Sequence, residues 1–162
     1  MQRAYEIQLM RTKVAEPSES LTSPQLIARY CQNLSRLDRE HFVRLDFNCQ
    51  LQVISRETVH ICTVDQVLIS PRDVFRGALL MGASRIALVH NHPSGDPEAS
   101  EEDTQAIERL QEAGRLLEIE LVDFLIIGDD GWYWSSVDSK THIVPKSPPC
   151  QMSLESYNRP IS

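Results

Sequence analysis

A short apolar strand that runs into a histidine-rich loop constrains the fold of this chain more than any other feature. Arg85–Val89 reads RIALV, which is typical of a strand buried on both faces of a sheet. The loop HNHPSGDPEA follows directly, and Ser100 then begins a helix that extends to about Leu117. With the order of the remaining elements, this segment predicts an α/β (α+β) chain whose mixed β-sheet is flanked by helices.

The other elements follow from periodicity and from capping residues. Ser23 and Pro24 are typical of an N-cap and a first helical position, and they predict a helix that ends near Leu34. A second helix begins at Ser70, with Val74, Phe75, Ala78 and Leu79 as its buried stripe. Alternating or strand-forming residues predict strands at 4–14, 40–47, 51–55, 58–64, 120–127 and 132–136, with turns at 48–50 and 128–131.

The length of 162 residues is enough for one domain with a core and too short for two. Residues 1–37 are expected to form an N-terminal strand and helix that are part of the core or appended to it. Residues 38–138 form the main domain, and residues 139–162, which are polar and dotted with prolines, form a flexible tail.

Composition excludes several classes of protein. The net charge is −7 and no cluster of Lys or Arg occurs, which argues against direct nucleic-acid binding. No apolar run reaches the length of a membrane span, and the N-terminus lacks the pattern of a signal peptide, so a cytoplasmic protein without a membrane partner is expected. The four cysteines form no CxxC pair and are expected to be reduced thiols in or near the core.

The loop after the apolar strand carries the residues that suggest chemistry. His90 and His92 are two positions apart, so in an extended chain both imidazoles point to the same side. Asp103 shares a helix face with Ile107 and Leu110, the face expected to pack on the sheet, where a carboxylate is costly unless it is paired or binds a metal. Two imidazoles and one carboxylate make a three-ligand site with an open position, which is typical of catalytic zinc.

Simpler explanations remain open for each of these residues. Either histidine alone is more often a hydrogen-bonded structural residue than a ligand. The run from Ser100 to Asp103 also fits a plain capping box, in which Asp103 only reaches back to the Ser100 amide. The joint pattern favours the metal site, because a helix cap does not require the histidines.

These motifs resemble a known family. His90-Asn91-His92-Pro93, with Ser100 and Asp103, is similar to the JAMM (MPN-plus) metallopeptidase motif. The wider text VHNHPSGDP, with SPRDVFRGALL before it and RLQEAGRLLEIELVDFLIIGD after it, resembles the bacterial RadC-like branch over residues 40–136. The resemblance implies a JAMM/MPN-like fold with cytidine-deaminase-like layering. It also implies a stand-alone RadC-like domain, since residues 1–35 show no helix-hairpin-helix motif.

The resemblance also implies roles for individual residues. It implies that His90, His92 and Asp103 bind one zinc ion and that Ser100 supports the oxyanion of the reaction. It matches Glu40 to the general acid/base, with Glu57 as the runner-up. Two positions depart from the family pattern, in which proline often stands at the position of Ala99 and histidine at that of Phe124, but no ligand is missing.

The implied function is a zinc-dependent hydrolase of metallopeptidase or isopeptidase type that acts on a peptide or protein substrate. The alternatives are a DNA-repair-associated accessory protein and a metal-binding interaction module without turnover. Pairing into a homo-oligomer through an edge strand or the tail stays open. Three further features are interpreted as structural: the turn Asp129-Asp130-Gly131, the aromatic run 132–134, and the pair His60 and Cys62, which lacks a third ligand.

Overall fold

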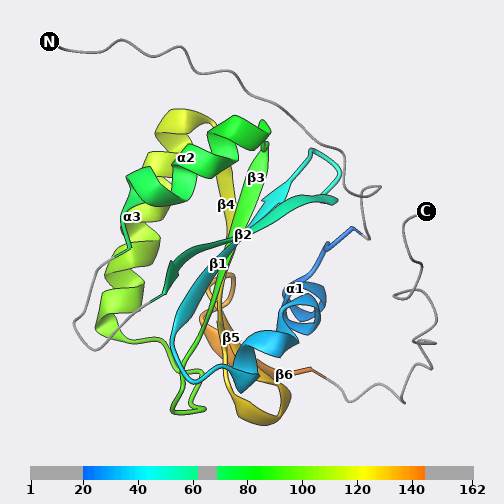
Figure 1. The fold of residues 1–162 in the computed structure, drawn as a ribbon, viewed down its shortest axis with the longest axis vertical. Coiled ribbons are helices and arrows are strands. Elements are labelled where there is room, and N and C mark those ends of the chain that lie inside the picture. Colours follow the sequence, from blue (N-terminus) through cyan, green and yellow to red (C-terminus); the bar gives the residue numbers. More distant parts are fainter. Residues whose placement is uncertain (1–19, 62–68, 145–162) are drawn as a thin grey trace, which may run out of the picture.

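Among the residues that the structure describes, six strands form one mixed sheet with helices on both faces (Figure 1). The computed structural model describes residues 20–61 and 69–144. The strand order is β2-β1-β3-β4-β5-β6; β3 and β4 are parallel, and every other neighbouring pair is antiparallel. The strands are β1 (His41–Phe47), β2 (Val53–Ile61), β3 (Arg85–Asn91), β4 (Glu120–Ile127), β5 (Trp132–Ser135) and β6 (Lys140–Ile143). This architecture confirms the predicted fold class.

The helices divide between the two faces of the sheet. The α-helices are α1 (Pro24–Tyr30), α2 (Pro71–Met81) and α3 (Glu101–Leu117), and two short 3₁₀ helices are η1 (Gln32–Arg36) and η2 (Asp129–Gly131). In Figure 1, α2 and α3 lie on one side of the sheet and α1 on the other. Within the part of the chain that the structure describes, no helix combines the length and the apolar character needed to cross a membrane.

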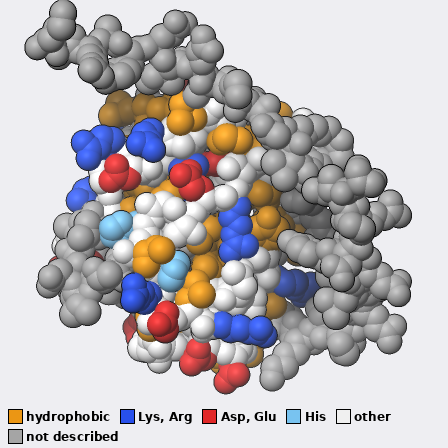
Figure 2. All heavy atoms as spheres, viewed as in Figure 1, with side chains coloured by type: hydrophobic (Ala, Val, Ile, Leu, Met, Phe, Trp, Pro, Cys, Tyr) orange, Lys and Arg blue, Asp and Glu red, His pale blue; other side chains and the backbone are white. Residues whose placement is uncertain are grey.

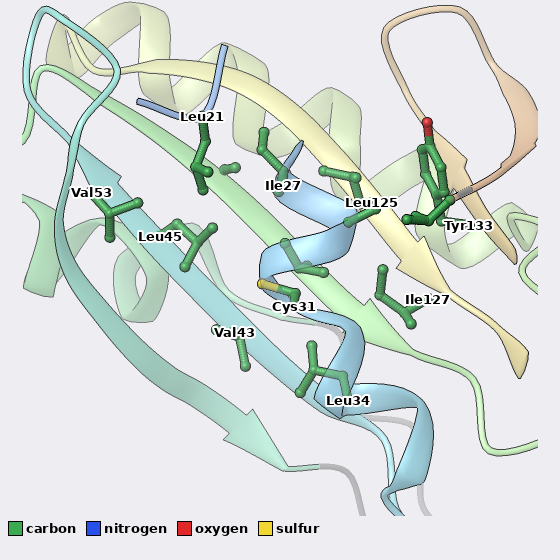
Figure 3. Close-up of a cluster of buried hydrophobic side chains, with 14 of the residues drawn as sticks. Leu21, Ile27, Cys31, Leu34, Val43, Leu45, Val53, Leu125, Ile127 and Tyr133 are labelled. Atoms are coloured by element: carbon green, nitrogen blue, oxygen red, sulfur yellow. The ribbon is translucent and has the colours of Figure 1, made fainter. Parts of the chain in front are cut away.

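Strand alternation builds a separate core on each face. Successive side chains point to opposite faces, so Val43, Val89 and Leu125 pack with α1, whereas Phe42, Leu88 and Phe124 pack with α2 and α3. Figure 3 shows the first cluster between α1 and the sheet, where Ile27, Cys31 and Leu34 face labelled residues of the sheet such as Val43, Leu45 and Leu125. Residues 86–89 of β3 and 124–127 of β4 are therefore apolar at every position, as the RIALV segment predicted for β3.

Helix starts follow the predicted caps in part. The Ser23 hydroxyl accepts the Leu26 amide at 3.3 Å and Pro24 opens α1, but the helix ends at Tyr30 and continues to Arg36 only as η1. Pro71 opens α2, yet the Ser70 side chain makes no capping bond. Leu79 is 54% exposed, so its assignment to the buried stripe was wrong.

The second half of the predicted hairpin differs from the structure. One continuous strand, β2, replaces the two strands predicted at 51–55 and 58–64. The polar run at Arg56 and Glu57 suggested a break, but β2 is an edge strand with an exposed centre, where polar side chains disturb no packing. β6 lies inside the segment predicted to be a flexible tail and pairs with β5. Residues 4–14, 62–64 and 145–162 lie outside the described residues.

The cysteine prediction holds for one of the two described residues. Cys31 and Cys49 are both free thiols, but Cys31 is buried in the α1 core and Cys49 is exposed. Burial raises the pKa of the Cys31 thiol to about 11, so this thiol stays protonated at neutral pH. Cys62 and Cys150 lie outside the described residues.

A buried ion pair fixes α2 on the sheet. The Arg44 guanidinium donates to both carboxylate oxygens of Asp46, at 2.7 and 3.0 Å, and to the Val74 carbonyl of α2 at 2.9 Å. It also donates to Glu57 at 2.6 Å. Gly77 of α2 leaves room for this group, because a Cβ there would collide with the guanidinium. Arg44 and Asp46 are almost fully buried, whereas the Glu57 side chain is 52% exposed.

Removal of the buried partner should therefore destabilise the fold more than removal of the exposed one. Asp46→Ala leaves a buried guanidinium without its main counter-charge and should lower the free energy of unfolding by about 3–5 kcal/mol. Glu57→Ala should lower it by less than about 1 kcal/mol, as is usual for exposed pairs. Urea unfolding of the two variants measures both values, and equal losses would contradict this description of the ion pair.

Candidate metal centre

The predicted site residues meet at the carboxyl end of β3. β1 runs antiparallel to β3 and pairs Phe42 with His90, so the residues just before β1 lie beside the end of β3. α3 begins at the same end of the sheet, after the loop that follows His92. In Figure 1 this is the lower end of the sheet. Three separate segments thus bring side chains to one place.

His90 is a buried imidazole without hydrogen bonds. It is 0% exposed and its ring lies between Phe42 and Phe124, with centroid distances of 4.4 and 5.2 Å. Neither ring nitrogen has a hydrogen-bond partner among the described residues. Burial lowers the pKa of His90 to about 3, so the ring is neutral at physiological pH. A neutral imidazole with an available lone pair is the form that binds a metal.

His92 presents one particular nitrogen to the site. Its Nδ1 lies 2.8 Å from the Asp96 carbonyl oxygen, which can only accept, so Nδ1 carries the proton. Nε2 lies 3.5 Å from Asp103 Oδ2 and 3.7 Å from Glu40 Oε1. Burial lowers the pKa of His92, but the interactions with Asp103, the Asp96 carbonyl and Glu40 outweigh it, and the pKa is raised. The Nδ1 bond fixes the ring orientation, as is usual for a metal-binding histidine.

Asp103 forms the predicted helix cap and also lies close to both histidines. Its Oδ2 accepts the Ser100 amide at 2.8 Å, and the Ser100 hydroxyl accepts the Asp103 amide at 3.1 Å, which completes a capping box. The same carboxylate lies 3.4 Å from His90 Nε2 and 3.5 Å from His92 Nε2. Burial raises its pKa, but hydrogen bonds with His92 and Ser100 and the nearby His90 outweigh this and hold the pKa at about 2. Asp103 is therefore an ionised carboxylate that faces both imidazoles.

Ser100 serves the helix cap in this structure. Its hydroxyl donates to Asp103 Oδ2 at 2.7 Å while it accepts the Asp103 amide. The single hydroxyl proton is thus directed at the carboxylate. Ser100 orients Asp103, and its role toward an oxyanion stays a prediction.

Glu40 lies just before β1 and approaches the histidines from that side. Its Oε1 lies 3.4 Å from His90 Nδ1 and 3.7 Å from His92 Nε2, and its side chain is 30% exposed. Glu40, His90 and His92 form the group whose ligand atoms all lie within 4.8 Å of one another, close enough to hold one metal ion. Glu57, the runner-up for the general acid/base, does not belong to this group, and its carboxylate accepts a hydrogen bond from Arg44 instead.

The structure therefore brings all five predicted side chains together but leaves the roles of the two carboxylates open. The sequence prediction made Asp103 the third ligand and Glu40 the base, whereas among the described residues the group whose ligand atoms all lie within 4.8 Å of one another contains Glu40. Both carboxylates lie 3.4 Å from a His90 nitrogen. The His90 ring, which has no hydrogen-bond partner among the described residues, and the nearby carboxylate oxygens fit a metal that accepts nitrogen and oxygen ligands. The identity of the metal and the assignment of ligand and base stay predictions.

The features interpreted as structural lie outside this group. Asp129 and Asp130 belong to η2 between β4 and β5. Tyr133 is buried in the α1 core. His60 lies on edge strand β2 and pairs with Phe42 of β1, and Cys62 lies outside the described residues.

Comparison with known proteins assigns the chain to a family. A family profile described as the RadC-like JAB domain matches residues 21–141. The chain belongs to the RadC-like JAB domain family. The match begins before α1 and ends inside β6, so it includes the whole candidate site of this RadC-like domain and confirms the resemblance noted in the sequence.

The similar proteins reported next are both named UPF0758 protein, a name that states no activity. A UPF0758 protein of Bacillus cereus strain AH187 is 43% identical over 125 residues, which cover 76% of this chain and 55% of that protein. A UPF0758 protein of Thermotoga maritima is 43% identical over 115 residues, which cover 71% of this chain and 52% of that protein. The chain thus spans about half the length of these relatives.

The turn between β4 and β5 supports the histidine loop. The Asp129 amide donates to the Gly95 carbonyl at 3.0 Å, and the His92 amide donates to the Ile127 carbonyl at 3.3 Å. A Cβ at Gly128 would lie 2.5 Å from the Gly95 carbonyl oxygen and 2.9 Å from Pro97 Cδ. Gly128 has a negative φ of −103°, so only this close approach, and not its backbone conformation, requires glycine.

Gly128→Ala should therefore push the loop away and disturb the orientation of His92. Metal affinity should fall by about 10–100-fold, the usual effect of losing support around a ligand. Gly114→Ala is the matched control, because its Cβ would also lie 2.5 Å from a backbone oxygen, that of Ile119, at the far end of α3. Chelator competition measures affinity in both variants; wild-type affinity in a folded Gly128→Ala protein would contradict the role of the turn.

Proposed function

We propose that this RadC-like domain is a zinc-dependent hydrolase of metallopeptidase or isopeptidase type. The observation that carries the proposal is the buried His90, whose ring nitrogens have no hydrogen-bond partner among the described residues and face two carboxylates. A buried polar group without partners is costly, and a metal ion would satisfy the ring nitrogen that carries the lone pair. His90, His92 and one carboxylate would hold the ion, and this mixed nitrogen and oxygen set suits zinc.

Zinc in such a site activates a water molecule by lowering its pKa to about 7 and polarises the carbonyl of the substrate. The residues of the chain supply the remaining chemistry. A general base must reach the water and must exchange its proton, whereas a ligand must be held in place.

The surroundings of the two carboxylates favour Asp103 as ligand and Glu40 as base. Asp103 is 7% exposed and is held by the Ser100 amide and hydroxyl. Glu40 has a side chain that is 30% exposed and stands just before a strand. We propose that Glu40 Oε1 accepts the proton of the water and then delivers it to the leaving amine, which is general acid–base catalysis by one group.

Ser100 has a second step in this proposal. Its hydroxyl holds Asp103 in the resting site and would turn toward the substrate oxygen as negative charge develops there. One such donor is commonly worth about 10²–10³ in rate.

The proposed substrate is a peptide or protein that presents an amide bond. The net charge of −7 argues against a nucleic acid. On the face shown in Figure 2, basic side chains are scattered among acidic, apolar and neutral ones and form no continuous basic patch. We also propose a cytoplasmic setting, which agrees with the free thiols of Cys31 and Cys49.

Glu40→Gln tests the catalytic part of the proposal. Zinc-loaded protein is incubated with a peptide library prepared from cell lysate, and new peptide termini are counted by mass spectrometry. Glu40→Gln should reduce cleavage by about 10²–10⁴-fold, the usual contribution of a general base, while saturating zinc keeps one ion per chain bound.

Glu57→Gln is the matched control and should cleave like the wild type, because Glu57 pairs with Arg44. Removal of zinc with a chelator should stop cleavage, and added zinc should restore it. Cleavage by Glu40→Gln at the wild-type rate would exclude Glu40 as the base. A zinc-loaded wild type that yields no new termini would contradict a general peptidase activity.

A further inference from the structure

Asn91, between the two histidines, carries an unusual set of hydrogen bonds. Asn91 is only 1% exposed. Because successive side chains of a strand point to opposite faces, the Asn91 side chain lies on the face opposite His90. Its Oδ1 accepts the His41 amide at 2.9 Å. Its Nδ2 donates to the Arg39 carbonyl at 2.9 Å and to the Leu37 carbonyl at 3.4 Å.

All three partners belong to the segment that carries Glu40. Residues 37–40 form neither helix nor strand, and the β1–β3 ladder ends at the pair Phe42 and His90. Just beyond the end of that ladder, the Asn91 side chain supplies the hydrogen bonds that hold this segment. The backbone on both sides of Glu40 is thus tied to the strand that carries the histidines.

Only an amide side chain can make this set of bonds. The His41 amide needs an acceptor, while the Leu37 and Arg39 carbonyls need a donor. Asparagine offers both in one plane, whereas aspartate only accepts and leucine does neither. The buried amide of Asn91 is therefore explained by the backbone groups of the Glu40 segment. The histidines do not explain it, because their rings lie on the other face.

We propose that Asn91 is a positioning residue for Glu40. It holds the Leu37–His41 backbone so that the Glu40 carboxylate stands 3.4 Å from His90 Nδ1 and 3.7 Å from His92 Nε2. The histidine loop and the carboxylate thereby move as one unit. This inference rests on the proposed function, since it assigns Asn91 to the same metal centre.

A positioning role and a purely structural role predict different results in a double-mutant cycle. Zinc affinity is measured by chelator competition in the wild type, Asn91→Leu, Glu40→Gln and the double variant. Loss of the Glu40 charge should weaken binding by about tenfold, the lower end of the range for groups around a metal. Asn91→Leu should weaken it about as much in the wild-type background and have little further effect in the Glu40→Gln background.

Two further measurements make the experiment decisive. The His41 amide should exchange with deuterium faster in Asn91→Leu, because its acceptor is gone. Asn48→Leu is the matched control, because the Asn48 side chain also accepts hydrogen bonds from backbone amides, those of Gln50 and Gln52, but lies away from the site. It should leave zinc affinity unchanged. If Asn91→Leu does not fold, Asn91→Ser takes its place in the cycle.

The outcomes separate this inference from the proposed function. Equal losses from Asn91→Leu in both backgrounds, or an unchanged exchange rate at His41, would overturn the positioning role while zinc binding stands. A wild type that binds no zinc would overturn the proposed function and, with it, the role of Asn91. Non-additive losses with faster exchange at His41 would support the positioning role.

Discussion

His90 is buried between two phenylalanine rings, and neither of its ring nitrogens has a hydrogen-bond partner among the described residues. An imidazole in such surroundings is neutral and keeps a lone pair available. Glu40 and Asp103 approach it from two sides at 3.4 Å each, and His92 adds a nitrogen whose orientation is fixed by the Asp96 carbonyl. The other contacts of the site are arranged around the His90 ring.

The fold creates that arrangement by bringing three segments of the chain together at one end of the sheet. The antiparallel pairing of β1 with β3 delivers Glu40, the end of β3 delivers the histidines, and the N-terminus of α3 delivers Asp103. Each segment is also held by a hydrogen bond to a backbone group: Asn91 to the Arg39 carbonyl before β1, the Asp129 amide after β4 to the Gly95 carbonyl, and the Ser100 amide to Asp103. Backbone support of this kind is what keeps ligands within the narrow geometry that a metal needs.

Much of this could be read from the sequence, because short spacings encode local geometry. The H-x-H pattern after an apolar strand and the S-x-x-D helix start placed His90, His92 and Asp103 together, and the family resemblance supplied Glu40. Long-range contacts were harder. The sequence could not separate Glu57 from Glu40 fully, because the bond between Glu57 and Arg44 joins residues on different strands. The role of Asn91 was missed, although a polar residue on a strand face otherwise filled by Val89 was a signal that partners must exist.

The most direct test is X-ray absorption at the zinc edge of the zinc-loaded protein. We expect a stoichiometric ion with two imidazole nitrogens and oxygen ligands, and the loss of one imidazole in His92→Ala. His142→Ala, which removes a histidine on β6 paired with Asp138, should leave the spectrum unchanged. A sulfur neighbour at about 2.3 Å, or a spectrum without two imidazoles, would contradict the metal centre described above.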